Sequence, residues 1–278
     1  MAMKILVTGG CGFIGTHLVR AARERGWDVV VLDSMISTTP SPRPECAVLK
    51  HTVTNFDACL RAMRGVHLVY HLAARSDWTD RPQHPAKLFS VNTHGTVEVL
   101  TAARIAGVQR VIFTSSAAVY GNCAPGRESD RCHPVTIYGA SKLAAEEACR
   151  GFTELGLDVT ILRLFTVWGE GGHSAVERFR SDSQPAIHGD GSQSRDFVHV
   201  DDVVSALLAA YTWEPGVYNI GTGVETSILG LWRLLRSDEP AFAPWRTQDI
   251  LRSFADITKV TSTTTWRPRR LLHEELAR

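Results

Sequence analysis

The chain has 278 residues, of which 44% are hydrophobic, so it can bury a full core and form one large α/β domain with an appended lobe. Its 30 lysine and arginine residues balance 29 acidic residues, with no basic block of the kind that binds nucleic acid or an anionic membrane. No apolar stretch reaches membrane-spanning length, and the N-terminus lacks the apolar run of a signal peptide. We therefore expect a cytoplasmic protein that binds a small molecule and neither nucleic acid nor a membrane.

The cysteines and histidines give no sign of a metal site. The six cysteines are scattered without a Cys-x-x-Cys pair, and His173, His188 and His199 match no ligand spacing. We predict reduced cysteines, no disulfide framework and no bound metal.

Short apolar runs alternate with longer amphipathic stretches from the N-terminus to Leu164. The expected strands are Lys4–Thr8, Asp28–Leu32, Ala47–Leu49, Leu68–Leu72, Arg110–Thr114 and Val159–Leu164. The clearest helices are expected at about Gly12–Gly26, Val91–Ala106 and Tyr138–Leu155. This alternation predicts an α/β fold with a doubly wound parallel sheet and crossover helices. Beyond Leu164 the regular pattern gives way to segments containing Gly, Pro and Trp, which indicates a smaller second lobe.

A glycine-rich turn follows the first expected strand, with Gly9, Gly12 and Gly15 in a G-x-x-G-x-x-G spacing. Glycines at this spacing let the backbone turn sharply, approach a pyrophosphate and pack the following helix against the sheet. The helix N-terminus then offers free N–H groups to the phosphates. Because a strand precedes the turn and a helix follows it, we interpret the segment as the dinucleotide-binding turn of a Rossmann fold.

The second expected strand ends at Asp33. A carboxylate in this position accepts hydrogen bonds from the adenosine ribose hydroxyls and repels a 2′-phosphate. No arginine follows until Arg43. The sequence therefore predicts NAD rather than NADP as the cofactor.

A tyrosine and a lysine lie four residues apart at Tyr138 and Lys142, on one face of an expected helix. Such a pair is common on helix surfaces, and alone it would be weak evidence for catalysis. Upstream, however, Thr114–Gly121 places hydroxyl side chains at the end of a strand. Ligands of open α/β sheets bind at this edge, so a hydroxyl from the strand end can join the phenol there.

Taken together, these motifs resemble the extended short-chain dehydrogenases/reductases of the NAD-dependent epimerase/dehydratase family, and most closely the UDP-glucose 4-epimerases and their nucleotide-sugar relatives. The resemblance covers nearly the whole chain. The matching segments are Gly9–Gly15, Leu32–Ser34, His71–Ala74, Asn92, Gly95–Thr96, Ser115–Gly121, Tyr138–Lys142, Leu162–Phe165, Gly189–Gly191, Arg195–Val200, Tyr218–Gly221 and Ala255–Asp256 before Trp266.

The resemblance implies a role for each matching residue. Tyr138 would exchange a proton with the sugar hydroxyl, Ser116 would share that proton and contact the substrate, and Lys142 would hold the nicotinamide ribose and lower the Tyr138 pKa from about 10. Ser115 is assigned to the backbone or the cofactor. The residues expected to bind NAD are Gly9, Gly12, Phe13, Ile14, Gly15, Asp33, Ser34, Leu72, Ala73, Ala74, Asn92, Ser115, Tyr138 and Lys142.

The sequence departs from the family pattern at several positions. Dehydratases and decarboxylases of the family carry carboxylates where this chain has Ala117–Ala118, which disfavours elimination of water and decarboxylation. Thr166 replaces a family asparagine that touches the nucleotide diphosphate. The stretches 169–189 and 235–252 are shorter than expected for the family.

The remaining substrate contacts are also carried over from the resemblance. Arg195 matches an arginine that reaches the nucleotide phosphates, and Arg246 and Asp249 match a segment that binds phosphate and ribose. The planar guanidinium group binds two phosphate oxygens at once. The alternative for Arg195 is a structural ion pair with Asp196 or Asp201.

We therefore expect residues 1–165, with returning segments near 197–221, to bind NAD, and residues 166–278 to form mainly a substrate lobe. The leading hypothesis is an NAD-dependent nucleotide-sugar 4-epimerase. The alternatives are a dehydrogenase or ketoreductase acting on a nucleotide-linked or smaller substrate, and an inactive dinucleotide-binding regulatory protein. By resemblance, the helices Val91–Ala106 and Tyr138–Leu155 pair across a two-fold axis in a homodimer.

Overall fold

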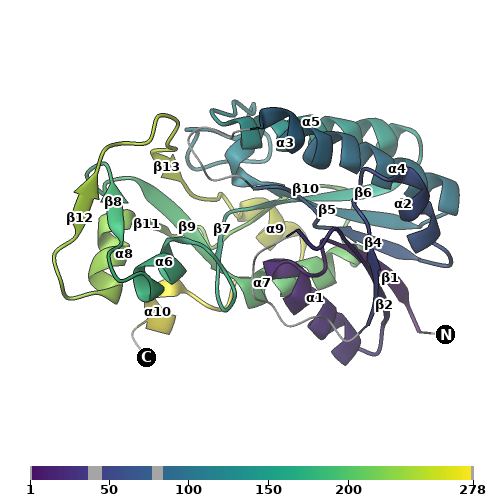
Figure 1. Cartoon of the computed structure of the whole chain (residues 1–278), viewed down its shortest axis with the longest axis horizontal. Helices are drawn as coiled ribbons and strands as arrows, with labels where there is room; N and C mark the ends of the chain where they lie inside the picture. The colour runs from purple at the N-terminus through teal and green to yellow at the C-terminus, as the bar shows by residue number, and fades with distance from the viewer. Residues whose placement is uncertain (1, 37–45, 77–83, 277–278) are drawn as a thin grey trace.

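The computed structural model describes residues 2–36, 46–76 and 84–276 (Figure 1). Its core is a seven-stranded sheet in which every pairing is parallel, in the order β10-β6-β5-β4-β1-β2-β3. These strands are β1 (Lys4–Thr8), β2 (Asp28–Asp33), β3 (Ala47–Lys50), β4 (Leu68–His71), β5 (Arg110–Ser116), β6 (Asp158–Leu164) and β10 (Gly216–Ile220). The order runs outward in both directions from β1, so the predicted doubly wound Rossmann fold is confirmed.

Helices cover both faces of this sheet, as Figure 1 shows. On one face lie α1 (Phe13–Glu24), α7 (Val200–Ala209) and α9 (Thr258–Thr263); on the other lie α2 (Phe56–Ala62), α3 (Pro85–Phe89), α4 (Gly95–Ala106) and α5 (Ile137–Glu154). Alternate residues of a strand face opposite sides, so Ile5 and Val7 of β1 pack with α1 while Leu6 packs with α4. Both cores are apolar, which explains the nearly continuous apolar runs of the strands.

The helix expected at Val91–Ala106 is longer and less regular than its sequence period indicates. It begins at Pro85, contains a π-helical turn at Ser90–His94, and continues as α4. A π turn inserts one extra residue per turn, and such turns occur often at functional sites. Asn92 lies within this turn and is buried.

A second lobe extends from the sheet edge around β9 (Ser194–His199) (Figure 1). β9 pairs in parallel with β7 (Thr166–Trp168) and β13 (Arg252–Ser253), and antiparallel with β11 (Glu225–Ser227). A separate pair joins β8 (Ala186–His188) to β12 (Ala241–Ala243). The helices α6 (Ala175–Ser181), α8 (Ile228–Leu235) and α10 (Leu272–Leu276) complete the lobe. Its own apolar core includes Trp168, Phe179, Phe197 and Trp232.

The chain crosses between the two parts more than once. β9 of the lobe runs directly into α7, which packs against α1, and β10 then joins the large sheet beside β6. Short 3-10 turns at Ala117–Val119 and Ala210–Thr212 follow β5 and α7. Among the described residues, none of the helices combines the length and apolar character needed to cross a bilayer.

Candidate functional site

The glycine-rich turn joins β1 to α1. Gly9 has a positive φ of 72°, and a side chain there would bring its Cβ within 2.7 Å of the Ala73 backbone nitrogen. A Cβ on Gly15 would come within 2.7 Å of the Gly10 Cα. Gly12 caps α1 without any side-chain hydrogen bond, and the first turn of α1 carries no acidic residue. The first N–H groups of the helix are therefore available to an anion, with no internal carboxylate competing for them.

Asp33 stands at the end of β2, beside this turn. Its carboxylate accepts hydrogen bonds from the backbone N–H groups of Cys11 at 3.0 Å and Met35 at 2.7 Å. Met35 has a left-handed φ of 59°, which folds the chain back over the carboxylate. Each carboxylate oxygen accepts more than one hydrogen bond, so Asp33 keeps capacity for two ribose hydroxyls. Ser34 lies next to it, whereas Arg43 lies outside the described residues.

A chain of buried hydrogen bonds connects the neighbouring loop to the π turn. The Thr8 hydroxyl accepts from the Ala73 N–H at 3.3 Å and contacts His71 Nδ1 at 2.7 Å. On the other side, His71 Nε2 lies 2.9 Å from the Thr96 hydroxyl, which donates to the Asn92 carbonyl. Because the Thr96 proton is used in this way, His71 donates from Nε2. Burial, reinforced by the positive charge of Lys142, lowers the His71 pKa to about 3.

Asn92 extends this network to α5. Its side-chain oxygen accepts from the Arg75 N–H at 2.7 Å, and its amide donates to the Arg75 carbonyl and to the Ser141 hydroxyl, each at 2.9 Å. Ser141 in turn donates to the Tyr138 carbonyl at 2.8 Å. Asn92 therefore connects the loop after β4, which contains the expected cofactor residues Leu72, Ala73 and Ala74, to the first turn of α5.

Tyr138 and Ser116 are brought together at the carboxyl end of β5. Thr136 caps α5 by accepting from the Gly139 N–H at 3.0 Å. A Cβ on Gly139 would lie 2.5 Å from the Ala118 carbonyl oxygen, so glycine permits the close approach of α5 to the 3-10 turn. The Ser116 side chain acts on the Tyr138 hydroxyl as a hydrogen-bonding group that lowers its pKa, so the two hydroxyls lie close together at the strand end.

The electrostatics of Tyr138 differ from our expectation. Burial raises the Tyr138 pKa, the hydrogen bond with Ser116 opposes that rise, and Lys142 makes no resolved contribution. Lys142 is 2% exposed and its ammonium lies 4.4 Å from the centre of the Phe113 ring. Burial lowers the Lys142 pKa to about 8. Within the described ranges, no residue hydrogen-bonds to this ammonium, so its three donors are available to a ligand.

Sequence reasoning missed a buried acid one turn beyond Lys142. Glu146 is fully buried and forms an ion pair with Arg163, at 2.7 Å between Oε2 and Nη2. The Ser115 hydroxyl donates to Glu146 Oε1 at 2.5 Å, so this side chain points towards α5 and only the Ser115 backbone remains for the cofactor. A carboxylate on the apolar face of a helix and an arginine inside an apolar strand were the available signals.

On the lobe side, Arg195 of β9 pairs with Asp249 at 2.7 Å. Its partner is therefore neither of the acids considered as the structural alternative: Asp196 accepts from the turn after β10, and Asp201 pairs with Arg270. Burial lowers the Arg195 pKa, Asp249 opposes this effect, and the positive charge of Arg246 adds to it.

A third arginine joins this cluster. Arg178 of α6 has its pKa lowered by partial desolvation and then by the charge of Arg246, with Asp182 opposing. Arg246, in the segment after β12, thus lies within electrostatic reach of both Arg178 of α6 and Arg195 of β9. Among these three arginines, only Arg195 forms a salt bridge with a described carboxylate. Nothing in the sequence pattern singled out Arg178. Thr166 lies in β7, opposite Phe197 of β9.

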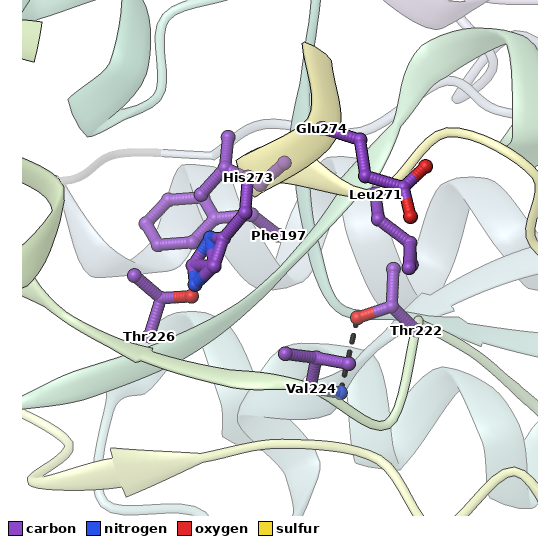
Figure 2. A pocket seen from close by; sticks show the side chains of 8 residues that line it. Phe197, Thr222, Val224, Thr226, Leu271, His273 and Glu274 are labelled. Carbon is purple, nitrogen blue, oxygen red and sulfur yellow. Dashed lines mark hydrogen bonds between the residues drawn. The ribbon is translucent and has the colours of Figure 1, made fainter. Parts of the chain in front are cut away.

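A small cavity lies elsewhere in the lobe, between α10 and the strands β9 and β11 (Figure 2). Figure 2 shows both apolar and polar side chains around it, with the Thr222 hydroxyl accepting a hydrogen bond from the Val224 backbone N–H. None of the sequence-predicted site residues lines it. In the part of the chain that the structure describes, no cluster of His, Cys, Asp and Glu side chains is arranged to hold a metal ion.

The described residues fit an NAD molecule at three points. The glycine turn and the uncapped start of α1 suit a pyrophosphate, Asp33 suits the adenosine ribose, and the Lys142 ammonium suits the second ribose. Gly9, Gly12, Phe13, Ile14 and Gly15 all belong to the first of these regions.

Comparison with known proteins gives the same family. A model of the NAD dependent epimerase/dehydratase family matches residues 5–221. The UDP-glucose 4-epimerase of Mycolicibacterium smegmatis is 34% identical, covering 99% of this chain and 97% of that protein. The crystal structure of Thermotoga maritima UDP-glucose 4-epimerase with UDP-glucose superposes with a TM-score of 0.91 at 32% identity, covering 99% and 96% of the two chains.

Another solved structure extends the range of activities among similar proteins. TunA, a NAD-dependent NDP-hexosamine 5,6-dehydratase, gives a TM-score of 0.92 at 30% identity and covers 98% of this chain and 94% of its own. Epimerisation and dehydration therefore occur on the same fold at similar sequence distance. The chain belongs to the NAD-dependent epimerase/dehydratase family of nucleotide-sugar enzymes, and its cofactor is NAD.

Proposed function

We propose that the protein is a nucleotide-sugar 4-epimerase. The observation that carries this proposal is the approach of the Ser116 side chain to the Tyr138 hydroxyl at the strand end, on the helix that also carries Lys142. Lys142 is 2% exposed, and its ammonium forms no hydrogen bond with a described residue. This is the arrangement needed to take a proton from a sugar hydroxyl and to hold a ribose next to it.

In this mechanism Tyr138 accepts the hydroxyl proton of the sugar and later returns it, while Ser116 keeps the hydroxyl aligned. Lys142 holds the nicotinamide ribose. When bound, NAD supplies the hydride acceptor and a positively charged ring that favours the ionised phenol. Burial raises the Tyr138 pKa, and such a nearby positive charge would oppose that rise.

The lobe supplies the groups for the nucleotide. Arg246 repels both Arg178 and Arg195, and a diphosphate would offset that repulsion. Asp249 holds Arg195 in place and offers a second acceptor for a ribose hydroxyl. We assign residues 1–165 and 197–221 mainly to NAD and residues 166–278 mainly to the substrate.

Dehydration and net oxidation of the substrate are less well supported than epimerisation. The turn Ala117–Ala118 carries no carboxylate for elimination of water, and Ala117 is buried. Net oxidation of the substrate requires release of the reduced cofactor, whereas epimerisation returns the hydride to the same sugar. Measuring net formation of NADH therefore distinguishes a dehydrogenase from an epimerase.

The test is to incubate the purified protein with a panel of nucleotide sugars and follow the anomeric proton signals by NMR and the reduced cofactor by absorbance. We expect a C4 epimer to form without net NADH. Stoichiometric NADH would identify a dehydrogenase, and loss of water from the sugar would identify a dehydratase. Binding of NAD and nucleotide sugar without any turnover would support the regulatory alternative.

A further inference from the structure

A polar layer lies directly beneath the candidate catalytic residues. Ser115 of β5, Arg163 of β6 and Asn219 of β10 are neighbours in register, so they form one row across three strands. All three are buried and lie on the face that α5 covers. The row begins one residue before Ser116.

Glu146 of α5 is the acceptor at the centre of this layer. Its Oε1 accepts from the Ser115 hydroxyl and from Arg163 Nε at 3.0 Å. Its Oε2 accepts from Arg163 Nη2 at 2.7 Å and from Arg150 Nη2 at 3.3 Å. Four hydrogen bonds, two of them from one guanidinium, hold this fully buried carboxylate in place.

The layer continues across the sheet. The Arg163 guanidinium lies 4.8 Å from the centre of the Tyr120 ring, and the Tyr120 hydroxyl donates to Asn219 at 2.7 Å. Arg163 Nη1 has no hydrogen-bond partner and is buried. Glu146 is therefore the only carboxylate among the described residues that pairs with Arg163.

Glu146 is also one helical turn from Lys142 and two turns from Tyr138, on the same face of α5. Its bond to Ser115 fixes the helix against the strand end that carries Ser116. We propose that Glu146 is a positioning residue that keeps Lys142 charged and holds the catalytic face of α5 against β5. This rests on the proposed function, because it assigns Lys142 a role as an ammonium.

The charged groups around Lys142 support an electrostatic effect of Glu146. The Lys142 ammonium is near His71, which is neutral, and above the Phe113 ring. Burial is the main influence on the Lys142 pKa, and Cys149 and Glu146 oppose it. Burial also raises the pKa of the Cys149 thiol, so that group is uncharged where Lys142 titrates. The carboxylate of Glu146 is then the negative charge that stabilises the ammonium.

The experiment measures Lys142 directly and needs no substrate. The chain has five lysines, so labelling their ε-carbons with ¹³C gives a simple NMR spectrum in which a Lys142→Arg variant identifies the Lys142 signal. The titration midpoint of Lys142 is expected well below the ordinary lysine value in the unaltered protein, because burial lowers its pKa. Glu146→Gln should lower that midpoint by at least about half a pH unit.

A matched control and a second variant complete the test. Glu154→Gln makes the same change at an exposed position of α5 and should leave the midpoint unchanged. Glu146→Gln leaves Arg163 unpaired in the core, so Glu146→Gln/Arg163→Gln removes both charges and protects folding. The double variant also lacks the Glu146 charge, so the Lys142 midpoint should again be lower than in the unaltered protein.

An unchanged Lys142 midpoint in a folded variant lacking the Glu146 charge would overturn the proposal, whether or not the protein epimerises any sugar. If turnover is found, the alkaline limb of its pH profile should move to lower pH in Glu146→Gln. A general loss of rate at all pH values, with no movement of that limb, would mean that Glu146 has only a structural role.

Discussion

Acidification should destabilise the protein through His71. The folded pKa of His71 is about 3, below the value of about 6.5 in the unfolded chain. Between these values the unfolded state binds more protons, so stability rises with pH and is lost as pH falls below about 6.5. At about pH 5 the loss from this one residue is about 2 kcal/mol, from 1.5 pKa units at about 1.4 kcal/mol each.

The assay is urea unfolding at several pH values between about 7.5 and 5, for the unaltered protein and His71→Gln. The variant loses hydrogen bonds to Thr8 and Thr96 and should be less stable at neutral pH. Because glutamine does not titrate, the gap between the two proteins should narrow by about 2 kcal/mol over this range. The control is His51→Gln, a change at an exposed position. A gap that stays constant with pH would refute the assignment of a neutral, buried imidazole.

Four further outcomes are expected. Tyr138→Phe should retain folding and NAD binding but lower turnover at least about 100-fold, and a near-normal rate would contradict the assigned proton exchange. Asp33→Ser should reduce the ratio of NAD affinity to NADP affinity measured by calorimetry. Equal affinities for NAD and NADP in the unaltered protein would contradict the assignment of Asp33 to the adenosine ribose. Arg178→Gln should weaken binding of nucleoside diphosphates several-fold while Arg180→Gln, an exposed change on the same helix, should not. Sedimentation should give a dimer through α4 and α5, and a monomer at micromolar concentration would contradict this prediction.

The features that could be predicted from sequence are those encoded locally. The glycine turn, Asp33 and the spacing of Tyr138 and Lys142 each depend on a few consecutive residues in a strand–turn–helix context. The period of apolar residues likewise indicated the parallel sheet and both of its covered faces.

The features that were missed depend on contacts between distant segments. The pairing of Glu146 with Arg163 and of Arg195 with Asp249 joins different elements, which residue spacing does not reveal. The π turn at Ser90–His94 differs from an α-helix by one residue, too little to change an apolar period. The expected lowering of the Tyr138 pKa failed because Lys142 faces the Phe113 ring and burial dominates.

The direct passage from β9 into α7 has a thermodynamic consequence. Arg195 lies in β9, only a few residues before α7, and α7 packs on α1, whose first turn faces the expected pyrophosphate. No linker separates Arg195, the proposed substrate contact, from α7, the helix that packs on α1. This direct connection is a route by which binding of the nucleotide sugar would affect binding of NAD, and such linkage is reciprocal. If a bound nucleotide sugar changes the NAD dissociation constant by some factor, bound NAD must change the dissociation constant of the nucleotide sugar by the same factor.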